Sequence, residues 1–373
     1  MALLEPEAPI RVYIHLGHGQ GGEQWEHRYN NGTLLGINEV KPYGYHRAAD
    51  WNCHVEYSVD LKEGRFQNVV RRGLVMGLGF DFVHAWRNAK RVWNADIIWT
   101  HTESQTLGLL LLFSIFPWRK RPRLIGQCVW MPDLWNQYSF LRKWLYSWLL
   151  GKVDIQTVLS PENLKVCQTL FPESRIEMIR FGIKAEKLPE VPRTIHRPIR
   201  IVAVGNDRHR DWTTVIAAFG SCDDFELRIV STAIRSKLPA RMKNVAIEKL
   251  SMNSELMDLY KWADIAVIGL RPNLHASGIT VIQEAVLNGI PVICSDTGGL
   301  RAYFGENEVR YVPVGGSAEM RDAALEIALN QDLRERMTQR ARARMGEGGL
   351  SSQAYVRRHV ELSRELLQRK FQG

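Results

Sequence analysis

The chain has 373 residues, of which 45% are hydrophobic and 24% charged, a length and composition that favour an ordinary folded protein with two domains. Lys and Arg residues number 49 against 40 Asp and Glu residues, and the resulting formal net charge of +9 favours an anionic partner. The sequence lacks zinc-ligand spacing, an aromatic RNA-binding pattern and a long basic run, so nucleic acid is not the partner that we expect.

The cysteines and the apolar segments favour a cytoplasmic protein. Five scattered cysteines include no CxxC pair, which indicates packed, reduced thiols rather than disulfides or a metal site. Acidic residues precede the first apolar run, and this order is not that of a signal peptide. The longest apolar run, residues 107–118, is shorter than the roughly twenty residues that span a bilayer. We therefore expect no membrane-spanning segment, although the protein could lie on a membrane surface.

In the first half of the chain, short apolar runs alternate with helical patterns. The runs predict buried strands of a parallel sheet and lie at 11–17, 95–101, 123–131 and 154–160. Helical patterns between these runs include residues 66–79 and 138–150. This alternation predicts βαβ units.

A second series of predicted strands occupies the second half of the chain. These strands lie at 199–206, 225–232, 245–249, 264–270 and 291–296, and helical patterns between them include 212–219 and 253–262. Residues 184–200 contain prolines and no periodicity, which predicts a linker, and residues 351–368 predict a long amphipathic helix. The fold class that follows is α/β with two Rossmann-like domains, which would hold a ligand between the carboxyl ends of their sheets.

A possible anion site follows the predicted strand at 264–270. The strand ends in a polar loop, and a helix begins near Gly278, Ile279 and Thr280. Free amides at a helix start attract a diphosphate, and glycine allows the backbone to approach it closely. Glu284 lies about one turn further on, where its carboxylate could accept both hydroxyls of a ribose. In the alternative interpretation, Glu284 only caps or pairs within a buried βαβ unit.

Residues 275–299 resemble the signature of GT-B glycosyltransferases of the family-4 type, the glycosyl transferases group 1. The preceding strand also matches, and the matching residues are Glu284-Ala285, Gly289, Pro291-Val292, Ser295 and Gly298-Gly299. The resemblance implies two Rossmann-like domains that face each other across a cleft. It places an acceptor-binding domain at 1–190, a donor-binding domain at 191–350 and a helix that crosses back at 351–373.

The resemblance also implies an activity and its substrates. The protein would be a hexosyltransferase that moves a sugar from a nucleoside diphosphate sugar to a glycan or lipid-linked acceptor, in cell-surface polysaccharide assembly. Glu284 would hold the donor ribose, and the amides of Gly278, Ile279 and Thr280 would hold the diphosphate. One departure concerns the sugar: the first glutamate of the family motif falls on Ala276. His275 or Ser277 could replace it, or His275 could be a merely exposed loop residue.

Residues 199–219 and 245–267 match two further segments of the family. In the first segment, Gly205 precedes Arg208 and Arg210, whose guanidinium groups would clamp the donor phosphates. Alternatively, the two arginines belong to a solvated loop and pair with neighbouring aspartates. In the second segment, the main chain near Lys249 would contact the nucleobase.

The N-terminal half supplies the remaining candidates. Gly21 and Gly22 follow the first predicted strand and would lie near the donor phosphates, although a glycine-rich loop alone is weak evidence. His101 ends a strand at the expected cleft wall, or only caps that strand. Asp133 would be the base if the reaction inverts the anomeric carbon, or it is a helix N-cap. In a retaining reaction the departing diphosphate would assist instead.

Residues 107–150 combine an apolar run, a cationic stretch and many aromatic residues. This combination suits contact with an anionic inner-leaflet surface, although a packed core helix explains the leucines equally well. We expect no cofactor and no metal, because arginines and helix amides can carry the phosphate charge. Two other protein classes fit the same architecture: a nucleotide-sugar epimerase or hydrolase, and a nucleotide-sugar-binding scaffold that has lost catalysis.

Overall fold

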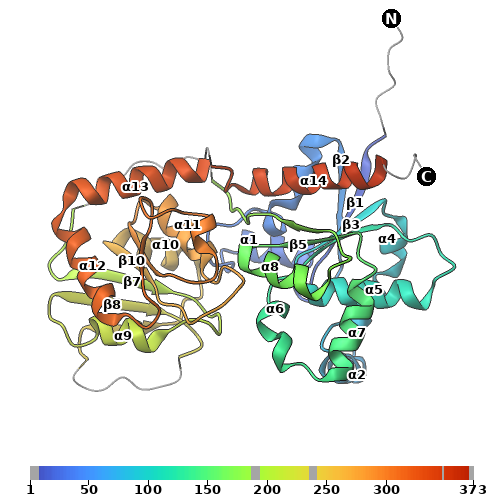
Figure 1. Ribbon diagram of the computed structural model, residues 1–373, viewed down its shortest axis with the longest axis horizontal. Coiled ribbons are helices and arrows are strands. Elements are labelled where there is room, and N and C mark those ends of the chain that lie inside the picture. The colour runs from blue at the N-terminus through green and yellow to red at the C-terminus, as the bar shows by residue number, and fades with distance from the viewer. Residues whose placement is uncertain (1–7, 186–193, 235–241, 347, 369–373) are drawn as a thin grey trace, which may run out of the picture.

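The computed structural model shows two parallel β-sheets, each covered by helices, that lie side by side along the long axis of the molecule (Figure 1). The structure describes residues 8–185, 194–234, 242–346 and 348–368. Two predictions fall partly outside the described residues. Residues 1–7 begin the N-terminal segment, which we do not expect to be a signal peptide, and residues 186–193 are the middle of the predicted linker. The predicted α/β fold class is confirmed.

The N-terminal domain is built on a sheet of six parallel strands in the order β2-β1-β3-β4-β5-β6. The predicted strands of this half of the chain are all present. The strands are β1 (Ile10–His15), β2 (Cys53–Tyr57), β3 (Ile97–Thr100), β4 (Arg123–Gln127), β5 (Ile155–Val158) and β6 (Ile176–Met178). Strands β2 and β6 form the two edges and were not predicted, because their half-exposed residues form no apolar run.

The C-terminal domain repeats this plan with six parallel strands in the order β12-β11-β10-β7-β8-β9. Its predicted strands are present too, and the unpredicted β12 is again a short edge strand. The strands are β7 (Ile199–Val204), β8 (Phe225–Val230), β9 (Val245–Glu248), β10 (Ile265–Ile268), β11 (Val292–Ser295) and β12 (Arg310–Val312). Inner strands of both sheets are largely buried, as expected for strands covered on both faces. They include β3, β4, β7, β10 and β11.

Helices connect the strands and cover both faces of each sheet. In the N-terminal domain they are α1 (Gly22–Asn30), η1 (Pro42–Trp51), α2 (Arg65–Leu78), α3 (Phe82–Arg87), α4 (Ala89–Asn94), α5 (Glu103–Ile115), α6 (Met131–Leu134), η2 (Trp135–Gln137), α7 (Phe140–Leu150) and α8 (Pro161–Leu170). In the C-terminal domain they are α9 (Trp212–Phe219), α10 (Asn253–Trp262), α11 (Ile279–Leu287), η3 (Leu300–Ala302), α12 (Ser317–Leu329) and α13 (Gln331–Gly346).

The last helix, α14 (Ser352–Gln368), runs back from the C-terminal domain along the strands of the N-terminal domain (Figure 1). The hydroxyl of Tyr355 donates to Oε1 of Gln127 at the end of β4, 2.6 Å away, and lies 3.0 Å from the hydroxyl of Tyr45. Nε1 of Trp99 on β3 donates to Oγ of Ser363 at 2.9 Å. One hydrophobic cluster contains residues of both sheets and of α14, so the two domains share a core.

The apolar run at 107–118 is mainly a core helix. Most of α5 is buried between the sheet and helices α3 and α7, which explains its leucines by packing. In the part of the chain that the structure describes, no helix is both long and apolar enough to cross a bilayer.

Tyr355→Phe tests how far α14 contributes to stability. The substitution removes the buried hydroxyl and leaves Oε1 of Gln127 without its donor, which should lower the free energy of unfolding by about 1–3 kcal/mol. Urea unfolding should show a lower midpoint at an unchanged m-value. Tyr29→Phe is the matched control, because Tyr29 is exposed and its hydroxyl should matter little. Equal midpoints for both variants would contradict this role of α14.

Candidate functional site

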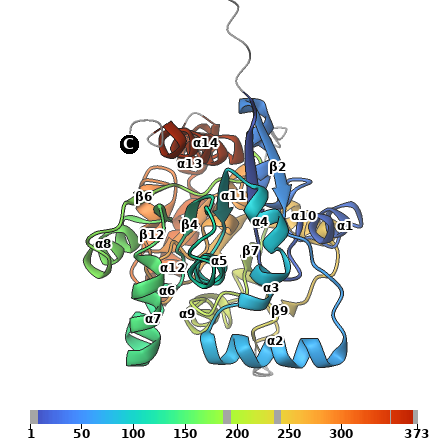
Figure 2. The same ribbon diagram turned by 90° about the vertical axis from the view of Figure 1, so that its right-hand side faces the viewer.

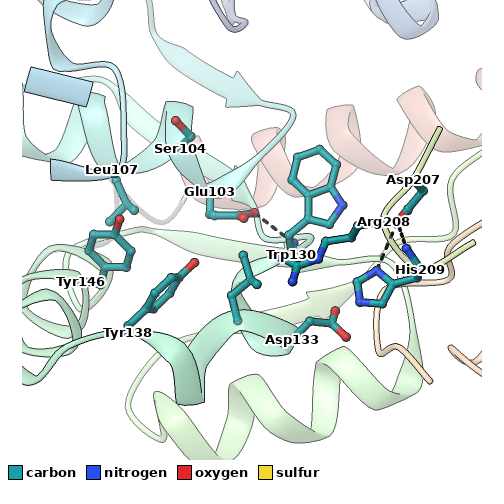
Figure 3. Close-up of a pocket in the computed structure, with 12 residues that line it drawn as sticks. Glu103, Ser104, Leu107, Trp130, Asp133, Tyr138, Tyr146, Asp207, Arg208 and His209 are labelled. Atoms are coloured by element: carbon teal, nitrogen blue, oxygen red, sulfur yellow. Dashed lines mark hydrogen bonds and ion pairs between the residues drawn. The ribbon is translucent and has the colours of Figure 1, made fainter. Parts of the chain in front are cut away.

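A cavity of about 650 Å³ opens between the two domains, where the carboxyl ends of their sheets face each other. Its N-terminal wall comes from the residues after β3 and β4 and from α7, and its C-terminal wall is the loop after β7. In Figure 3, Leu107, Tyr138 and Tyr146 lie on one side, and Arg208 and its neighbours lie on the other. This position is the one at which open α/β sheets bind ligands.

Arg210 carries a buried guanidinium group that lacks part of its hydrogen bonding. Only 6% of the residue is exposed, and among the described residues its Nε and Nη1 atoms have no partner. Burial lowers the pKa of Arg210, although carboxylates nearby oppose this shift. A buried cation without a partner is costly, commonly several kcal/mol, so the arrangement favours an anionic ligand.

Two glycines make room for the guanidinium of Arg210. Gly205, at the end of β7, has φ 150°, and Gly278, the N-cap of α11, has φ 86°. A Cβ atom at Gly205 would overlap Nε of Arg210, and one at Gly278 would lie 2.6 Å from Nη1. The guanidinium group therefore lies at the start of α11, where the helix dipole also attracts anions. In that turn the amide of Ile279 already donates to the carbonyl of Ala276, and Thr280 is exposed.

Glu284 lies inside α11 and joins three parts of the structure. Its Oε2 accepts a hydrogen bond from the hydroxyl of Tyr260 on α10 at 2.8 Å, and its Oε1 accepts from the amide of Ile37 in the N-terminal domain at 3.1 Å. Burial raises its pKa, and these two donors oppose the rise. Each oxygen keeps a second lone pair, so the predicted contact with a ribose stays a prediction.

The loop that precedes α11 binds the N-terminal domain through His275. Nδ1 of His275 lies 2.8 Å from Oδ2 of Asp133, and Nε2 lies 3.1 Å from Oδ2 of Asp207. The amide of Leu274 donates to the other oxygen of Asp133, and Oγ of Ser160 donates to the carbonyl of Leu274. Asp133, predicted as a base, is thus held by two donors of the C-terminal domain.

The two carboxylates determine the charge of the imidazole. Because ionised carboxylates only accept hydrogen bonds, both nitrogens of His275 act as donors and the ring is a cation. Burial opposes this charge, but the bonds to Asp133 and Asp207 outweigh it and raise the pKa of His275 to about 9. Burial also opposes the charge of Asp207, yet its bonds to His275 and to the amide of His209 hold its pKa well below the usual range.

The next two residues of this loop, Ala276 and Ser277, are buried and do not line the cavity. Ala276, at the position of the absent first glutamate, is buried and has a φ of 54°. Ser277 is buried, and its hydroxyl donates to Oδ2 of Asp207 at 3.0 Å. The carboxylates at the cavity wall are those of Glu103, Asp133 and Asp207. Sequence reasoning did not find Asp207 as a site residue, and it weighed this aspartate only as a counter-charge.

Among the described residues, one cluster has ligand atoms close enough together to hold a metal ion, and it consists of Asp207, His209 and His275. One ligand atom from each lies within 4.8 Å of the others, and two imidazoles with a carboxylate suit a divalent transition metal. Both nitrogens of His275 are already engaged by carboxylates, however, so a metal would have to replace the proton on Nε2. The structure satisfies the charges of this cluster with a protonated histidine.

Other predicted residues lie outside the cavity wall. His101 stacks on Tyr43 with ring centroids 3.4 Å apart, its Nδ1 lies 3.0 Å from the hydroxyl of Tyr45, and burial lowers its pKa to about 3. Gly21 donates its amide to Asp60, and Gly22 begins α1. Lys249 is exposed after β9.

Arg208 is the predicted arginine that lines the cavity itself. Its side chain is exposed, and it lies between Trp130 and Asp207 (Figure 3). The structure therefore separates the two arginines: Arg210 is buried beside Gly278, and Arg208 faces the cavity.

Several solved structures superpose on almost the whole chain. Sucrose-phosphate synthase from Thermosynechococcus elongatus superposes with a TM-score of 0.72 at 15% sequence identity, covering 96% of this chain and 99% of that chain. HepE from Anabaena, solved in complex with UDP-glucose, superposes at 0.65 and 12% identity, covering 94% and 98%. A glycosyltransferase from Rickettsia africae superposes at 0.59 and 16% identity, covering 97% and 99%. The chain therefore has the GT-B fold.

The sequence match is confined to the C-terminal domain. The model of the family described as Glycosyl transferases group 1 matches residues 239–344, a segment that contains β9, α11 and most of α13. This match and the fold confirm the resemblance to GT-B glycosyltransferases, and they support glycosyl transfer. No curated protein sequence matches the chain.

Arg210→Met tests whether the buried guanidinium binds a diphosphate. Because the variant removes an unpaired buried cation, the ligand-free protein should melt at the same temperature or higher. Its affinity for UDP, GDP or ADP, whichever binds the wild type best, should fall about a hundredfold, as expected when a buried charge partner is lost. Thermal shift and calorimetry measure the two quantities. Arg336→Met, at an exposed position of α13, is the control, and equal affinity in both variants would contradict the role of Arg210.

Proposed function

We propose that the protein is a hexosyltransferase that transfers a sugar from a nucleoside diphosphate sugar to a glycan or lipid-linked acceptor in cell-surface polysaccharide assembly. The observation that carries the proposal is the buried guanidinium of Arg210 beside the N-cap Gly278. A donor diphosphate would give this cation its missing partner. HepE, which shares the fold, was solved with UDP-glucose, a ligand of this chemical class.

The donor would bind mainly to the C-terminal domain. Its diphosphate would contact Arg210, Arg208 and the start of α11, and its ribose would reach Glu284. The main chain near Lys249 would contact the base, and Gly21 and Gly22 would approach the phosphates from the other domain. Arginine and helix dipoles are sufficient in kind to stabilise the leaving diphosphate, so the proposal includes neither a metal nor a cofactor.

The transfer step would take place in the cavity. An acceptor hydroxyl forms a bond to the anomeric carbon of the donor, the bond from that carbon to the diphosphate breaks, and the diphosphate leaves with the electron pair. In an inverting reaction the hydroxyl proton passes to Asp133, and in a retaining reaction it passes to the leaving diphosphate. The anomeric configuration of the product distinguishes the two routes.

Product analysis with a panel of nucleotide sugars tests the proposal. We expect nucleoside diphosphate release that depends on a glycan or lipid-linked acceptor, and an unchanged rate after EDTA treatment, because cationic side chains carry the phosphate charge. Glu284→Ala should lower kcat/KM about tenfold or more if it removes the ribose contact.

Three other outcomes would each contradict part of the proposal. Conversion of the donor without an acceptor would indicate an epimerase or a hydrolase, and donor binding without turnover would indicate a scaffold. Loss of activity in EDTA would indicate that transfer requires a metal ion.

The exposed surface of α2 and α7 supports attachment to the inner face of a membrane. None of the residues of α2 is buried, and α2 runs along the lower edge of the N-terminal domain in Figure 2. Arg142 and Tyr146 of α7 donate to carbonyls at the end of α2, so the two helices are neighbours. The exposed apolar residues of this α2–α7 surface are Phe66, Val69, Val70, Leu74, Met76, Phe140, Leu141, Trp144 and Trp148.

An anionic bilayer is the occupant that fits this α2–α7 surface. Phe66 and Met76 are about four-fifths exposed at 80% and 81%, and exposed Arg65 and Arg72 lie on the same helix. An amphipathic helix with cations beside large apolar side chains binds at the interface of anionic lipids. The cavity reaches Gly79 at the end of α2, so a lipid-linked acceptor would have a short route from the bilayer.

Removal of two apolar side chains tests this attachment. The double variant Phe66→Ser, Trp144→Ser should partition onto phosphatidylglycerol vesicles at least about tenfold more weakly than the wild type, because two large apolar contacts are lost. Sedimentation with phosphatidylcholine vesicles shows whether anionic charge is required. Leu329→Ser, at a position 70% exposed on α12, is the control. Wild-type protein that sediments with neither lipid would contradict membrane attachment.

A further inference from the structure

His275 makes a buried connection between the two walls of the cavity. Its side chain is 4% exposed, and that of its partner Asp133 is 7% exposed. Asp133 belongs to α6 of the N-terminal domain, and Asp207 belongs to the loop after β7 of the C-terminal domain. Both carboxylates also line the cavity. One imidazole therefore holds an acceptor-side carboxylate and a donor-side carboxylate at the same time.

The surrounding contacts enclose this imidazole. The ring of Trp130 lies edge-on to the ring of His275, with the two centroids 6.4 Å apart. The centroid of the His209 ring lies 5.0 Å from that of His275. Both ring nitrogens are directed at carboxylates, so neither can reach a substrate without breaking one of these two contacts. The imidazole therefore acts on the reaction through the aspartates that it orients.

We infer that His275 is a positioning residue that joins Asp133 to Asp207 and thereby fixes the acceptor side and the donor side of the cavity in the arrangement needed for transfer. The inference rests on the proposed function and deepens it. Separation of the two carboxylates would leave the donor-binding residues of the C-terminal domain intact, but would misplace the acceptor relative to the anomeric carbon. A small displacement between reacting groups lowers the rate far more than the affinity.

The charged groups around His275 determine the pH range over which it links Asp133 to Asp207. Asp133, Asp207 and the more distant buried Glu103 all favour the imidazolium, and the neighbouring His209 contacts Asp207 rather than His275 through hydrogen bonds. Because the pKa of His275 is raised from 6.5 to about 9, its stabilising effect is fully present below pH 6.5 and is lost as pH rises through about 9. Because the pKa of Asp207 is lowered, its carboxylate stays ionised at mildly acidic pH and keeps its bond to His275.

Steady-state kinetics of His275→Gln across pH 6 to 10 test the inference. Gln cannot donate to both carboxylates, so kcat should fall about tenfold to a hundredfold, as expected for lost bonds to a charged group. The KM for the nucleotide sugar should stay within about twofold, because the donor lies on the C-terminal domain. The wild type should lose activity above a pH of about 9, and the variant should lack this alkaline limb. His54→Gln, at an exposed position of β2, is the control with wild-type kinetics.

A second measurement separates this inference from the proposed function. The melting temperature of the wild type should exceed that of His275→Gln near pH 7, and the difference should shrink as pH rises to 10. This comparison needs no turnover, so it tests the bridge even if no donor and acceptor give a product. An unchanged kcat in the variant, a persistent alkaline limb, or a melting difference that is independent of pH would overturn the inference.

Discussion

The buried cation of Arg210 is the constraint around which the start of α11 and the loop after β7 are arranged. Its guanidinium occupies space that only glycine leaves free at positions 205 and 278, and it lies against the first turn of α11. A folded protein that keeps a partly unpaired cation in its interior gives up stability there, and binding an anion recovers it. In the proposed function, the diphosphate of the nucleotide sugar would be this anion.

Contacts between the domains complete the site. Glu284 accepts a hydrogen bond from the amide of Ile37, His275 bonds to Asp133, and α14 packs over the strands of the N-terminal domain. The loop that precedes α11 and the N-terminal wall of the cavity are thus held together by buried hydrogen bonds to carboxylates. Such bonds are strong and directional, and they depend on protonation, which connects the geometry of the cavity to pH.

Apolar residues of the N-terminal domain occupy two different environments, the core beside α5 and the exposed surface of α2 and α7. The leucines of α5 fill the core, whereas many apolar residues of α2 and α7 face outward beside arginines. The segments also differ in composition, because α5 has no Lys or Arg and α2 has three arginines. A surface of this kind next to the cavity suits an acceptor that carries an apolar chain.

The amino-acid sequence was enough to predict the doubly wound architecture, nine of the strands and the residues near the start of α11, but not the edge strands β2, β6 and β12. These features depend on apolar periodicity and on glycine, which act over a few neighbouring residues. Arg210 was a candidate for the same local reason. The three-dimensional arrangement was needed to show that His275 meets Asp133, 142 positions away, that Asp207 lines the cavity, and that His101 stacks on Tyr43 away from the cavity wall. Those contacts arise from the way the two sheets face each other, and no local pattern encodes the pairing of distant loops.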